Sequence, residues 1–583
     1  MNGLEVTVGI GGAAGDGNAA TGDTLAKVCA RLGLHVFVYN SYQSIIRGGH
    51  VWLRMRIADE KVECHGDHLN LMLALNQDTL NQHTAEVNPN GGILYNSDKL
   101  QVAQDDLQSG VVLYPFPVKD LSEKFGRNPV MQNTVLLGGL LWLLDLDFEV
   151  LEGMLRETFR RKGDKIVEAN VGVARAGYQY AIEHYAKRDY RWRLSGKRRM
   201  VVSGNELFGM GALAAGCKFY AAYPMTPASS ILHWLVRYGP RHGTVVKQAE
   251  DEIAVMNMTV GAGHVGARAM CGTSGGGFAL MTEAIGLAGM TETPVVVISA
   301  QRGGPSTGLP TKTEQADLNQ LFGASQGEYP RAIMAPVDVV DCYYSVVEAF
   351  NIAEKYQCPV LIASDLMLSE HRETADPEAF TFDVAIDRGE LITNGVPADY
   401  KRYRFTESGV SPRVLPGHEG TAYVTPSDEH DEQGILISDE FTNPPIRKAM
   451  MEKRMRKVDG ILRELPAPEL YGPAEADVTL VGWGSTQGLI REAVALLAEE
   501  GITANHLQIK YLVPFHAAEV EAILQHSKCK INVEHNFTGQ LARHIRAETG
   551  IKMDEKILKY DGEPLEPHHI VAHVKEVLHA YSR

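Results

Sequence analysis

A ten-residue stretch at 221–230 (AAYPMTPASS) carries residue types that could hold a small anionic substrate. Pro224 and Pro227 fix φ and disfavour helix at the residues that precede them, so the backbone there is predicted to be a stiff, extended turn. This turn presents the hydroxyl of Thr226 between the two proline rings. Helix is predicted to resume near Ser229, which can cap it, and the free N–H groups of a helix start can face an anion.

Three further polar stretches follow this turn: KQAEDE at 247–252, GTSGGG at 272–277 and QRGGPSTGLPTKTEQ at 301–315. They alternate with apolar segments, which predicts two strand–loop–helix units in sequence. In a parallel sheet built from such units, the loops at the carboxyl ends of the strands form the ligand crevice. Glu250, Asp251 and Glu252 stand at a helix start, where the helix dipole favours any of the three, so these residues are equivalent on that ground.

The motifs resemble the pyrimidine-binding domain of the 2-oxoacid:ferredoxin oxidoreductases. The substrate loop of that family reads Tyr-Pro-Ile-Thr-Pro, and residues 223–227 differ from it only at Met225. Residues 301–315 are similar to the arginine loop of the same family. Within the family, the chain most resembles the alpha subunit of 2-oxoglutarate:ferredoxin oxidoreductases that carry a fused gamma domain at the N-terminus. The likeness extends over nearly the whole chain.

This resemblance implies a chemistry and assigns roles to residues. A 2-oxo acid loses CO2 only when an electron sink takes up the developing carbanion, and thiamine diphosphate provides one. The resemblance implies that Glu250 hydrogen-bonds the pyrimidine ring of the cofactor as a buried carboxyl group of raised pKa. Arg302 is implied to bind the substrate carboxylate through its planar fork. Thr226 would contact the substrate and the cofactor site, and Tyr223 would line the pocket.

The seven cysteines are scattered, and none lies in a C-x-x-C pair, so the spacings typical of zinc and iron–sulfur ligands are absent. We therefore expect no metal ligands in this chain and an electron-carrying cluster on another one. The family resemblance implies a beta subunit that carries a 4Fe–4S cluster, Mg2+ and the diphosphate site. It also implies ferredoxin as electron acceptor and a dimer of heterodimers.

The implied reaction is the oxidative decarboxylation of 2-oxoglutarate to succinyl-CoA and CO2, with coenzyme A as acyl acceptor and two electrons passed singly to ferredoxin. Members of the family also run in reverse, so CO2 fixation, as in a reductive TCA cycle, is a further expectation. The alternatives are the same chemistry on pyruvate or a branched-chain 2-oxo acid, and a thiamine-dependent subunit that serves a lipoyl domain. A nicotinamide-dependent dehydrogenase and a non-catalytic scaffold are two more.

The N-terminal part resembles the gamma domain of the family. The chain opens with a predicted strand that ends in a glycine turn (EVTVGIGG), the start of an α/β unit. The next predicted strand ends in Asn40, where an NAD site needs an acidic residue for the ribose, so nicotinamide binding is disfavoured. In the loop 41–50 (SYQSIIRGGH), Arg47, Gly48 and Gly49 are candidate contacts for coenzyme A or the partner subunit. A surface turn with a solvated arginine is the alternative.

The predicted fold class is α/β with several domains, as expected for 583 residues. The predicted domains are a gamma-type α/β domain at 1–190, a transketolase-like pyrimidine-binding domain at 197–375, an extended interface segment at 376–470, and a transketolase C-terminal-like α/β domain at 471–583. The third segment is rich in charge and proline and lacks a sustained period, so we expect it to wrap across a subunit interface. This segment contains two histidines, His418 and His430, and His430 is expected to lie in a solvated loop.

Composition excludes two classes of partner. The formal charge of −16 and the isoelectric point near 5.7 argue against binding to nucleic acid or to an anionic membrane surface. The N-terminus shows no charged and apolar leader, and the longest apolar run is well short of the ~20 residues that span a bilayer. A cytoplasmic protein is expected.

Overall fold

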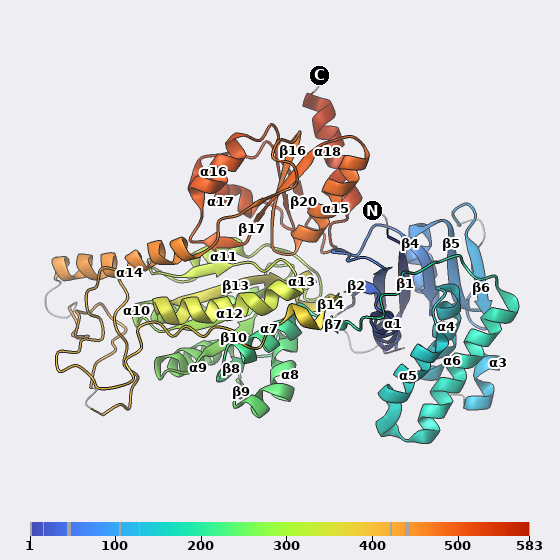
Figure 1. The fold of residues 1–583 in the computed structure, drawn as a ribbon, viewed down its shortest axis with the longest axis horizontal. Helices are drawn as coiled ribbons and strands as arrows, with labels where there is room; N and C mark the ends of the chain where they lie inside the picture. Colours follow the sequence, from blue (N-terminus) through green and yellow to red (C-terminus); the bar gives the residue numbers. More distant parts are fainter. Residues whose placement is uncertain are drawn as a thin grey trace. The chain divides into compact units, whose positions relative to one another are not determined.

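The computed structural model describes residues 3–15, 17–43, 48–103, 107–126, 129–419, 422–437 and 443–581. The chain forms two compact units (Figure 1). Unit 1 comprises residues 1–202 and 371–380, and unit 2 comprises residues 203–370 and 381–583. Both units combine helices with sheets that contain parallel strands, so the predicted multi-domain α/β class is confirmed. Among the described residues, no helix is both long enough and apolar enough to cross a membrane.

The described strands of unit 1 form one mixed sheet in the order β6-β5-β4-β1-β3-β2-β14-β7. Their bounds are β1 (Glu5–Ala13), β2 (His35–Ser41), β3 (His50–Ala58), β4 (Leu69–Ala74), β5 (Val87–Asn96), β6 (Val112–Phe116), β7 (Met200–Val202) and β14 (Arg372–Ala375). The helices of this unit are α1 (Asn18–Leu32), α2 (Gln77–His83), α3 (Val118–Ser122), α4 (Pro129–Leu143), α5 (Phe148–Phe159) and α6 (Asp164–His184).

Helices α4 and α6 pack closely because both carry glycine at the contact. A Cβ atom at Gly138 would overlap the carbonyl oxygen of Ala174, and one at Gly177 would overlap the carbonyl oxygen of Val135. The leucine-rich run of α4 is therefore buried in the core beneath the sheet. This packing explains why α4 consists mainly of apolar residues although it is too short to span a bilayer.

One predicted domain boundary is corrected by the sheet of unit 1. Residues up to 375 were assigned to the pyrimidine-binding domain, but β14 pairs antiparallel with β2 and with β7. Strand pairing between segments so distant in sequence leaves no mark on local sequence pattern. The chain thus returns to unit 1 after the pyrimidine-binding domain and completes the edge of its sheet.

Unit 2 is built around a sheet in the order β18-β12-β13-β11-β10-β8-β9, which is parallel except at β18. The strands are β8 (Phe219–Ala222), β9 (Val245–Gln248), β10 (Ala269–Thr273), β11 (Val295–Gln301), β12 (Ala332–Met334), β13 (Pro359–Asp365) and β18 (Tyr511–Val513). Its helices are α7 (Gly204–Ala214), α8 (Ser229–Tyr238), α9 (Glu252–His264), α10 (Gly275–Met290), α11 (Leu318–Gly323), α12 (Val339–Tyr356) and α13 (Leu366–Glu370).

The C-terminal part of unit 2 has a second sheet in the order β15-β17-β16-β19-β20. Its strands are β15 (Leu470–Tyr471), β16 (Val478–Trp483), β17 (Ala504–Ile509), β19 (Lys530–Glu534) and β20 (Glu555–Leu558), with helices α15 (Thr486–Glu499), α16 (Ala517–Gln525), α17 (Gln540–Thr549) and α18 (Pro567–Tyr581). Strand β18 leaves this part of the chain and pairs antiparallel with β12. A single hydrophobic core therefore runs from one sheet to the other.

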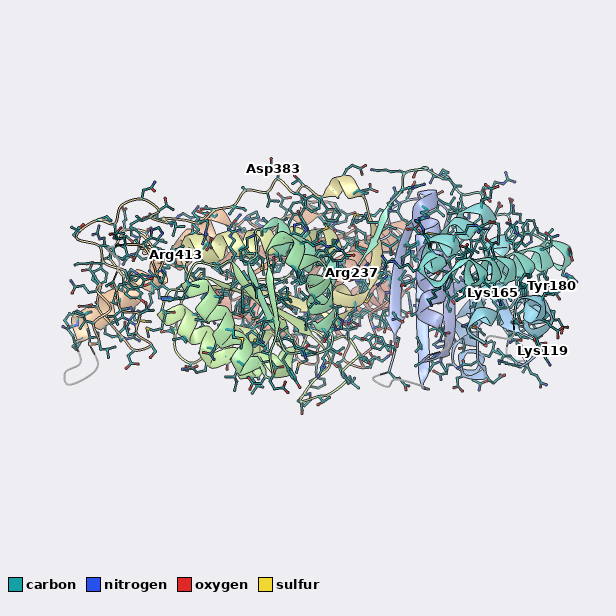
Figure 2. The ribbon with its side chains drawn as sticks, turned by 90° about the horizontal axis from the view of Figure 1, so that it is seen from below. Lys119, Lys165, Tyr180, Arg237, Asp383 and Arg413 are labelled. Atoms are coloured by element: carbon teal, nitrogen blue, oxygen red, sulfur yellow. The ribbon has the colours of Figure 1, made fainter. Side chains whose placement is uncertain are left out.

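The segment 381–443 has little regular structure among its described residues, but buried charge anchors it to unit 2. Glu354, which is buried on α12, accepts hydrogen bonds from Arg268, Arg388 and Arg413. The last two of these arginines belong to the segment, and Figure 2 labels Arg413. Because a carboxylate in the interior needs such partners, the segment is fastened to its own chain.

Helix α14 (Pro444–Glu464), which follows this segment, is also anchored to unit 2 by buried charged side chains. Lys453 and Lys457 are fully buried and lie 2.6 and 2.5 Å from the carboxylate of Glu292. His430 is also buried and packs against the ring of Tyr403 at a centroid distance of 4.1 Å. The expectation that His430 lies in a solvated loop is therefore wrong, because the loop folds back onto α14 through buried side chains.

Candidate active site

The predicted substrate turn follows β8 and is held from two sides. Arg302 donates a hydrogen bond from Nη1 to the backbone carbonyl of Thr226 at 2.8 Å. The buried Asn205 donates from Nδ2 to the carbonyl of Pro227 and to Oγ of Ser230, both at 2.7 Å. Helix α8 begins directly after the turn, as predicted, but no side chain caps it. The structure thus brings together two of the predicted site residues.

Arg302 has an acidic neighbour in Asp317, which lies just before α11. Burial lowers the pKa of Arg302, and the charge of Asp317 partly opposes this. Burial likewise raises the pKa of Asp317 to about 6, and the charge of Arg302 partly opposes it. The Asp317 side chain occupies the space beside Gly275, where any Cβ would overlap it. The Asp317 carboxylate thus lies against the N-terminal turn of α10.

Glu252 lies at the same turn of α10, on the other side. Its side chain is 3% exposed, and Oε1 makes no hydrogen bond to any described residue. Burial raises the pKa of Glu252, the charge of Asp251 adds to this, and a backbone N–H opposes it. A Cβ atom at Gly277 would overlap both Glu252 Oε1 and the hydroxyl of Thr273, so glycine is required here. The glycine turn predicted at 272–277 therefore makes room for a buried carboxyl group.

Glu250, to which the family resemblance assigned the buried carboxyl role, is exposed on the bend between β9 and α9. The physical reason is the cap of α9, because Asp251 accepts a hydrogen bond from the backbone N–H of Ala254 at 2.7 Å. This cap makes Glu252 the first helical residue and turns it into the core. The position of Glu250 does not meet the requirement for burial, whereas that of Glu252 does. The preference of aspartate for the N-cap position is the sequence signal that could have indicated this.

Tyr223 directly follows β8 and is 36% exposed. It therefore lies at the surface of the turn, where one face of its ring can line a pocket completed by another molecule. Sequence reasoning missed a second acid in this region, Glu314, which is 9% exposed and makes no hydrogen bond or ion pair with described residues. Burial raises the pKa of Glu314 to about 7, and the charges of Asp317 and Asp561 add to this.

The C-terminal part of the chain holds the arginine loop in place through Gln315. The backbone N–H of this buried residue donates to the carbonyl of His535 at 2.7 Å, and its Nε2 donates to the carbonyl of Trp483 at 3.1 Å. Oδ1 of Asn536 accepts a hydrogen bond from the backbone N–H of Gly539 at 2.8 Å, just before α17, but no side chain caps that helix itself.

The candidate coenzyme A loop lies in unit 1. Arg47 falls outside the described residues. Gly48 and Gly49 both have positive φ, at 75° and 73°, and two backbone hydrogen bonds join them to Ala14 at 3.3 and 3.1 Å. The turn is thus tied to the residue that directly follows β1. Ala13, at the end of β1, pairs with His50 at the start of β3.

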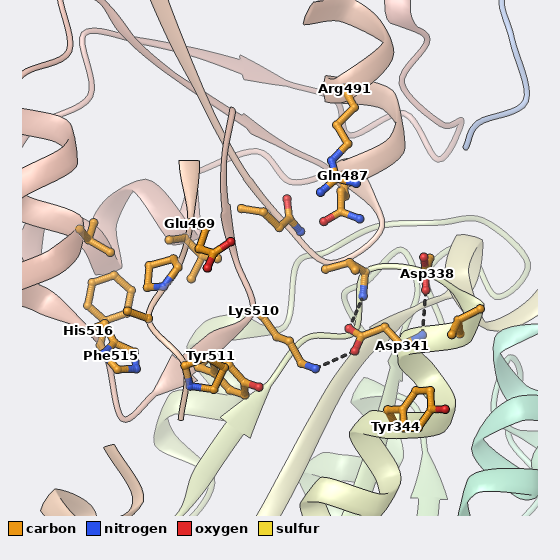
Figure 3. A pocket seen from close by; sticks show the side chains of 18 residues that line it. Asp338, Asp341, Tyr344, Glu469, Gln487, Arg491, Lys510, Tyr511, Phe515 and His516 are labelled. Atoms are coloured by element: carbon orange, nitrogen blue, oxygen red, sulfur yellow. Dashed lines mark hydrogen bonds and ion pairs between the residues drawn. The ribbon is translucent and has the colours of Figure 1, made fainter. Parts of the chain in front are cut away.

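A separate cavity of about 570 Å³ lies in unit 2 between α12 and the C-terminal sheet (Figure 3). Lys510 lies 2.6 Å from the carboxylate of Asp341 at its wall, and Arg491, Gln487 and Tyr344 point into the same region. None of the predicted site residues lines this cavity. It is therefore distinct from the site around Arg302 and Glu252.

Comparison with protein families matches three parts of the chain. Residues 210–450 match the thiamine diphosphate-binding domain of pyruvate flavodoxin/ferredoxin oxidoreductases, residues 7–180 match the pyruvate ferredoxin/flavodoxin oxidoreductase domain, and residues 476–570 match core domain II of pyruvate:ferredoxin oxidoreductases. The ranges 7–180 and 476–570 fall within unit 1 and the C-terminal part of unit 2, whereas the range 210–450 runs from α7 through the segment 381–443 into α14.

Curated relatives and a solved structure agree with this result. The chain is 33% identical to subunit alpha of 2-oxoacid:ferredoxin oxidoreductase 2 from Aeropyrum pernix, over 99% of this chain and 98% of the relative. It is 32% identical to the 2-oxoglutarate oxidoreductase subunit KorA of Mycobacterium tuberculosis, over 93% and 87%. A structure of 2-oxoglutarate:ferredoxin oxidoreductase from Magnetococcus marinus, with 2-oxoglutarate, coenzyme A and succinyl-CoA bound, matches with a TM-score of 0.91 and 34% identity, covering 98% of this chain and 99% of that one.

Taken with the site geometry, these matches show that the chain belongs to the 2-oxoacid:ferredoxin oxidoreductase family and is an oxidoreductase subunit. The Aeropyrum relative is named as subunit alpha, one part of an enzyme with more than one subunit.

Proposed function

We propose that this chain is the alpha subunit, with a fused gamma-type domain, of a 2-oxoglutarate:ferredoxin oxidoreductase. Two observations carry the proposal: Arg302 is hydrogen-bonded to the turn at Thr226, and the buried Glu252 at the N-terminal turn of α10 has an Oε1 without a partner among the described residues. The arginine could bind the carboxylate of a 2-oxo acid. The buried acid could hydrogen-bond a ring nitrogen of the cofactor. The match to the Magnetococcus enzyme supports this choice of substrate.

Thiamine diphosphate, when bound, supplies the electron sink that decarboxylation of a 2-oxo acid requires. Glu252 fits this cofactor better than Glu250, because its Oε1 is buried and lacks a partner among described residues. Its raised pKa suits a carboxyl group that shares a proton with a ring nitrogen. Thr226 would lie between cofactor and substrate. The diphosphate and Mg2+ would be held by the beta subunit.

Arg302 would bind the substrate carboxylate. One of its N–H groups is used on the carbonyl of Thr226, which fixes the plane of the guanidinium fork. The remaining N–H donors can then meet a carboxylate in the bidentate geometry that arginine favours. The hydroxyl of Thr226 would donate to the same carboxylate or to the 2-oxo oxygen. Tyr223 would cover the pocket from the solvent side.

Electrons would leave through the partner. All seven cysteines are buried and unpaired by disulfides, and their spacing suits no cluster. A beta subunit with a 4Fe–4S cluster would therefore pass electrons singly to ferredoxin, in a dimer of heterodimers located in the cytoplasm. Coenzyme A would accept the acyl group, with Gly48 and Gly49 as contacts in unit 1. The same machinery run in reverse would fix CO2, as in a reductive TCA cycle.

The test is to purify the chain with its natural partner and analyse thiamine, magnesium and iron. Ferredoxin reduction is then compared for 2-oxoglutarate, pyruvate and a branched-chain 2-oxo acid, with coenzyme A and without lipoamide. We expect fastest reduction with 2-oxoglutarate. Faster turnover of pyruvate or the branched-chain acid would show that this acid, and not 2-oxoglutarate, is the preferred substrate. A strict need for lipoamide or NAD+ would refute the proposal.

A further inference from the structure

A second cavity, of about 360 Å³, lies within unit 1, where the first turns of α1 meet α4, α5 and the start of α6. Its volume falls within the roughly 300–1,000 Å³ that small-molecule pockets occupy. None of the described residues proposed for the 2-oxo acid, thiamine or coenzyme A lines this cavity. It therefore needs a ligand of its own.

The inner wall of the cavity is apolar and held in place by packing. Leu137 of α4 and Leu155 of α5 are buried members of the hydrophobic core of unit 1. Phe125 and Phe159, which also line the cavity, pack against that core. The ring of Phe125 fills the space where Gly172 lacks a side chain. Because close-packed side chains keep their positions, the cavity has a defined apolar surface to offer.

Three polar side chains in the wall have their donors satisfied within their own helices. The hydroxyl groups of Thr21 and Thr24 each donate to the backbone carbonyl four positions earlier, at 3.1 and 2.7 Å. Nδ2 of Asn170 does the same at 2.8 Å. A donor that is already hydrogen-bonded gains little from a ligand. The interior of the cavity therefore suits the apolar part of a ligand rather than a polar group.

The rim of the cavity is cationic. Lys162, just before α6, and Lys165, in the first turn of that helix, are exposed and line the cavity, and Figure 2 labels Lys165. Nζ of Lys162 lies over the ring of Phe159, 5.3 Å from its centroid. Neither lysine forms an ion pair with a described residue, and no described aspartate or glutamate lines the cavity. In a chain of formal charge −16, this rim is a local site of positive charge.

We propose that this cavity binds an aliphatic monocarboxylate, with its hydrocarbon chain against Leu137 and Leu155 and its carboxylate at Lys162 and Lys165. Burial of the chain supplies the affinity, because each methylene group that leaves water contributes. The two ammonium groups select an anionic head group, which stays at the rim where water also reaches it. The site is distinct from those of the 2-oxo acid and coenzyme A, and it does not depend on which 2-oxo acid the enzyme uses.

The experiment titrates the complex of this chain with its natural partner, using calorimetry, with hexanoate, octanoate, decanoate and dodecanoate. We expect one saturable site per chain, with a Kd that falls about fourfold for each added methylene group. The Kd should level off once the chain is longer than the cavity, because further methylene groups stay in water. An excess of coenzyme A should not displace octanoate. Binding that does not saturate, that ignores chain length, or that coenzyme A abolishes would overturn the proposal.

Variants locate the binding site and separate its two parts. Lys162→Gln and Lys165→Gln should each weaken octanoate about threefold and leave the uncharged 1-octanol unaffected. Lys119→Gln, at an exposed lysine of α3 that Figure 2 also labels, is the matched control and should change neither. Ala169→Leu places a larger side chain in the cavity and should abolish binding of both ligands.

The thermal unfolding of each variant shows whether its fold is intact, and the lysine variants test the proposal even where Ala169→Leu unfolds. Octanoate that binds a folded Ala169→Leu complex as tightly as wild type would place the site elsewhere. Equal weakening of octanoate and 1-octanol by the lysine variants, or no weakening of octanoate, would contradict the role of the two ammonium groups.

Discussion

Arg302 and Thr226 are 76 positions apart, and the guanidinium group of the first is hydrogen-bonded to the backbone carbonyl of the second at 2.8 Å. Each belongs to a loop that leaves a different parallel strand, β11 and β8, with β10 between them in the sheet. The bond therefore bridges one strand and closes the crevice at the carboxyl edge. An anion bound there would meet a side chain whose orientation is already fixed.

Replacing Arg302 by lysine should keep the positive charge and lose the planar guanidinium group. We expect kcat/KM for the 2-oxo acid to fall about 100-fold, because an ammonium group lacks the planar fork that can bond Thr226 and still present two parallel N–H groups to a carboxylate. Thiamine content of the complex should not change. Arg237→Ala, at an exposed arginine of α8 that packs on Tyr238, is the matched control. Equal kinetics for R302K and wild type would contradict the substrate-binding role.

The acids near Arg302 should make substrate binding depend on pH. Burial raises the pKa of Glu314 to about 7 and that of Asp317 to about 6. As pH rises through this range, both groups gain negative charge beside an anion site, so KM for the 2-oxo acid should rise between pH 6 and 8. Glu314→Gln should flatten the upper part of that rise. A KM profile identical to that of wild type would show that Glu314 does not face the substrate.

Two neighbouring glycines of α10 should respond in opposite ways to alanine. A Cβ atom at Gly277 would overlap Glu252 and Thr273, whereas one at Gly276 meets nothing within 4 Å. Gly277→Ala should lower the free energy of unfolding by about 1–3 kcal/mol through overpacking. Gly276→Ala should leave it unchanged or raise it by up to about 1 kcal/mol, since alanine favours helix. Thermal unfolding of both variants compares their stabilities. An equal loss of stability in the two variants would contradict this prediction.

The buried lysine of α14 should make stability rise with pH. Burial, with the charges of Lys457 and Arg402, lowers the pKa of Lys453 to about 7 from 10.5, against the pull of Glu292. Between these values the unfolded chain binds more protons than the folded chain, so the free energy of unfolding increases as pH rises. Lys453→Met should reduce that increase. Lys448→Met, at an exposed position of the same helix, should leave it intact. Denaturant unfolding from pH 7 to 9 measures the free energy of unfolding. If it increased equally with pH in wild type and K453M, the account would be contradicted.

Local signals sufficed for the substrate turn and the glycine turn, because prolines and glycines act over a few residues. The choice between Glu250 and Glu252 depended on Asp251 being the N-cap of α9, which leaves Glu250 before the helix and makes Glu252 its first residue. Contacts such as Gln315 with His535, 220 positions apart, leave no trace in either local sequence. The same is true of β14, which completes a sheet begun more than 300 positions earlier.

The buried state of Glu252 is the feature on which the site most depends. The measurement is hydrogen–deuterium exchange at C2 of thiamine in the purified complex, for Glu252→Gln and Glu250→Gln side by side. We expect exchange to be abolished in E252Q, because the amide cannot share a proton with the ring nitrogen, and retained in E250Q, whose side chain is exposed. Retained exchange in E252Q, or its loss only in E250Q, would contradict the account.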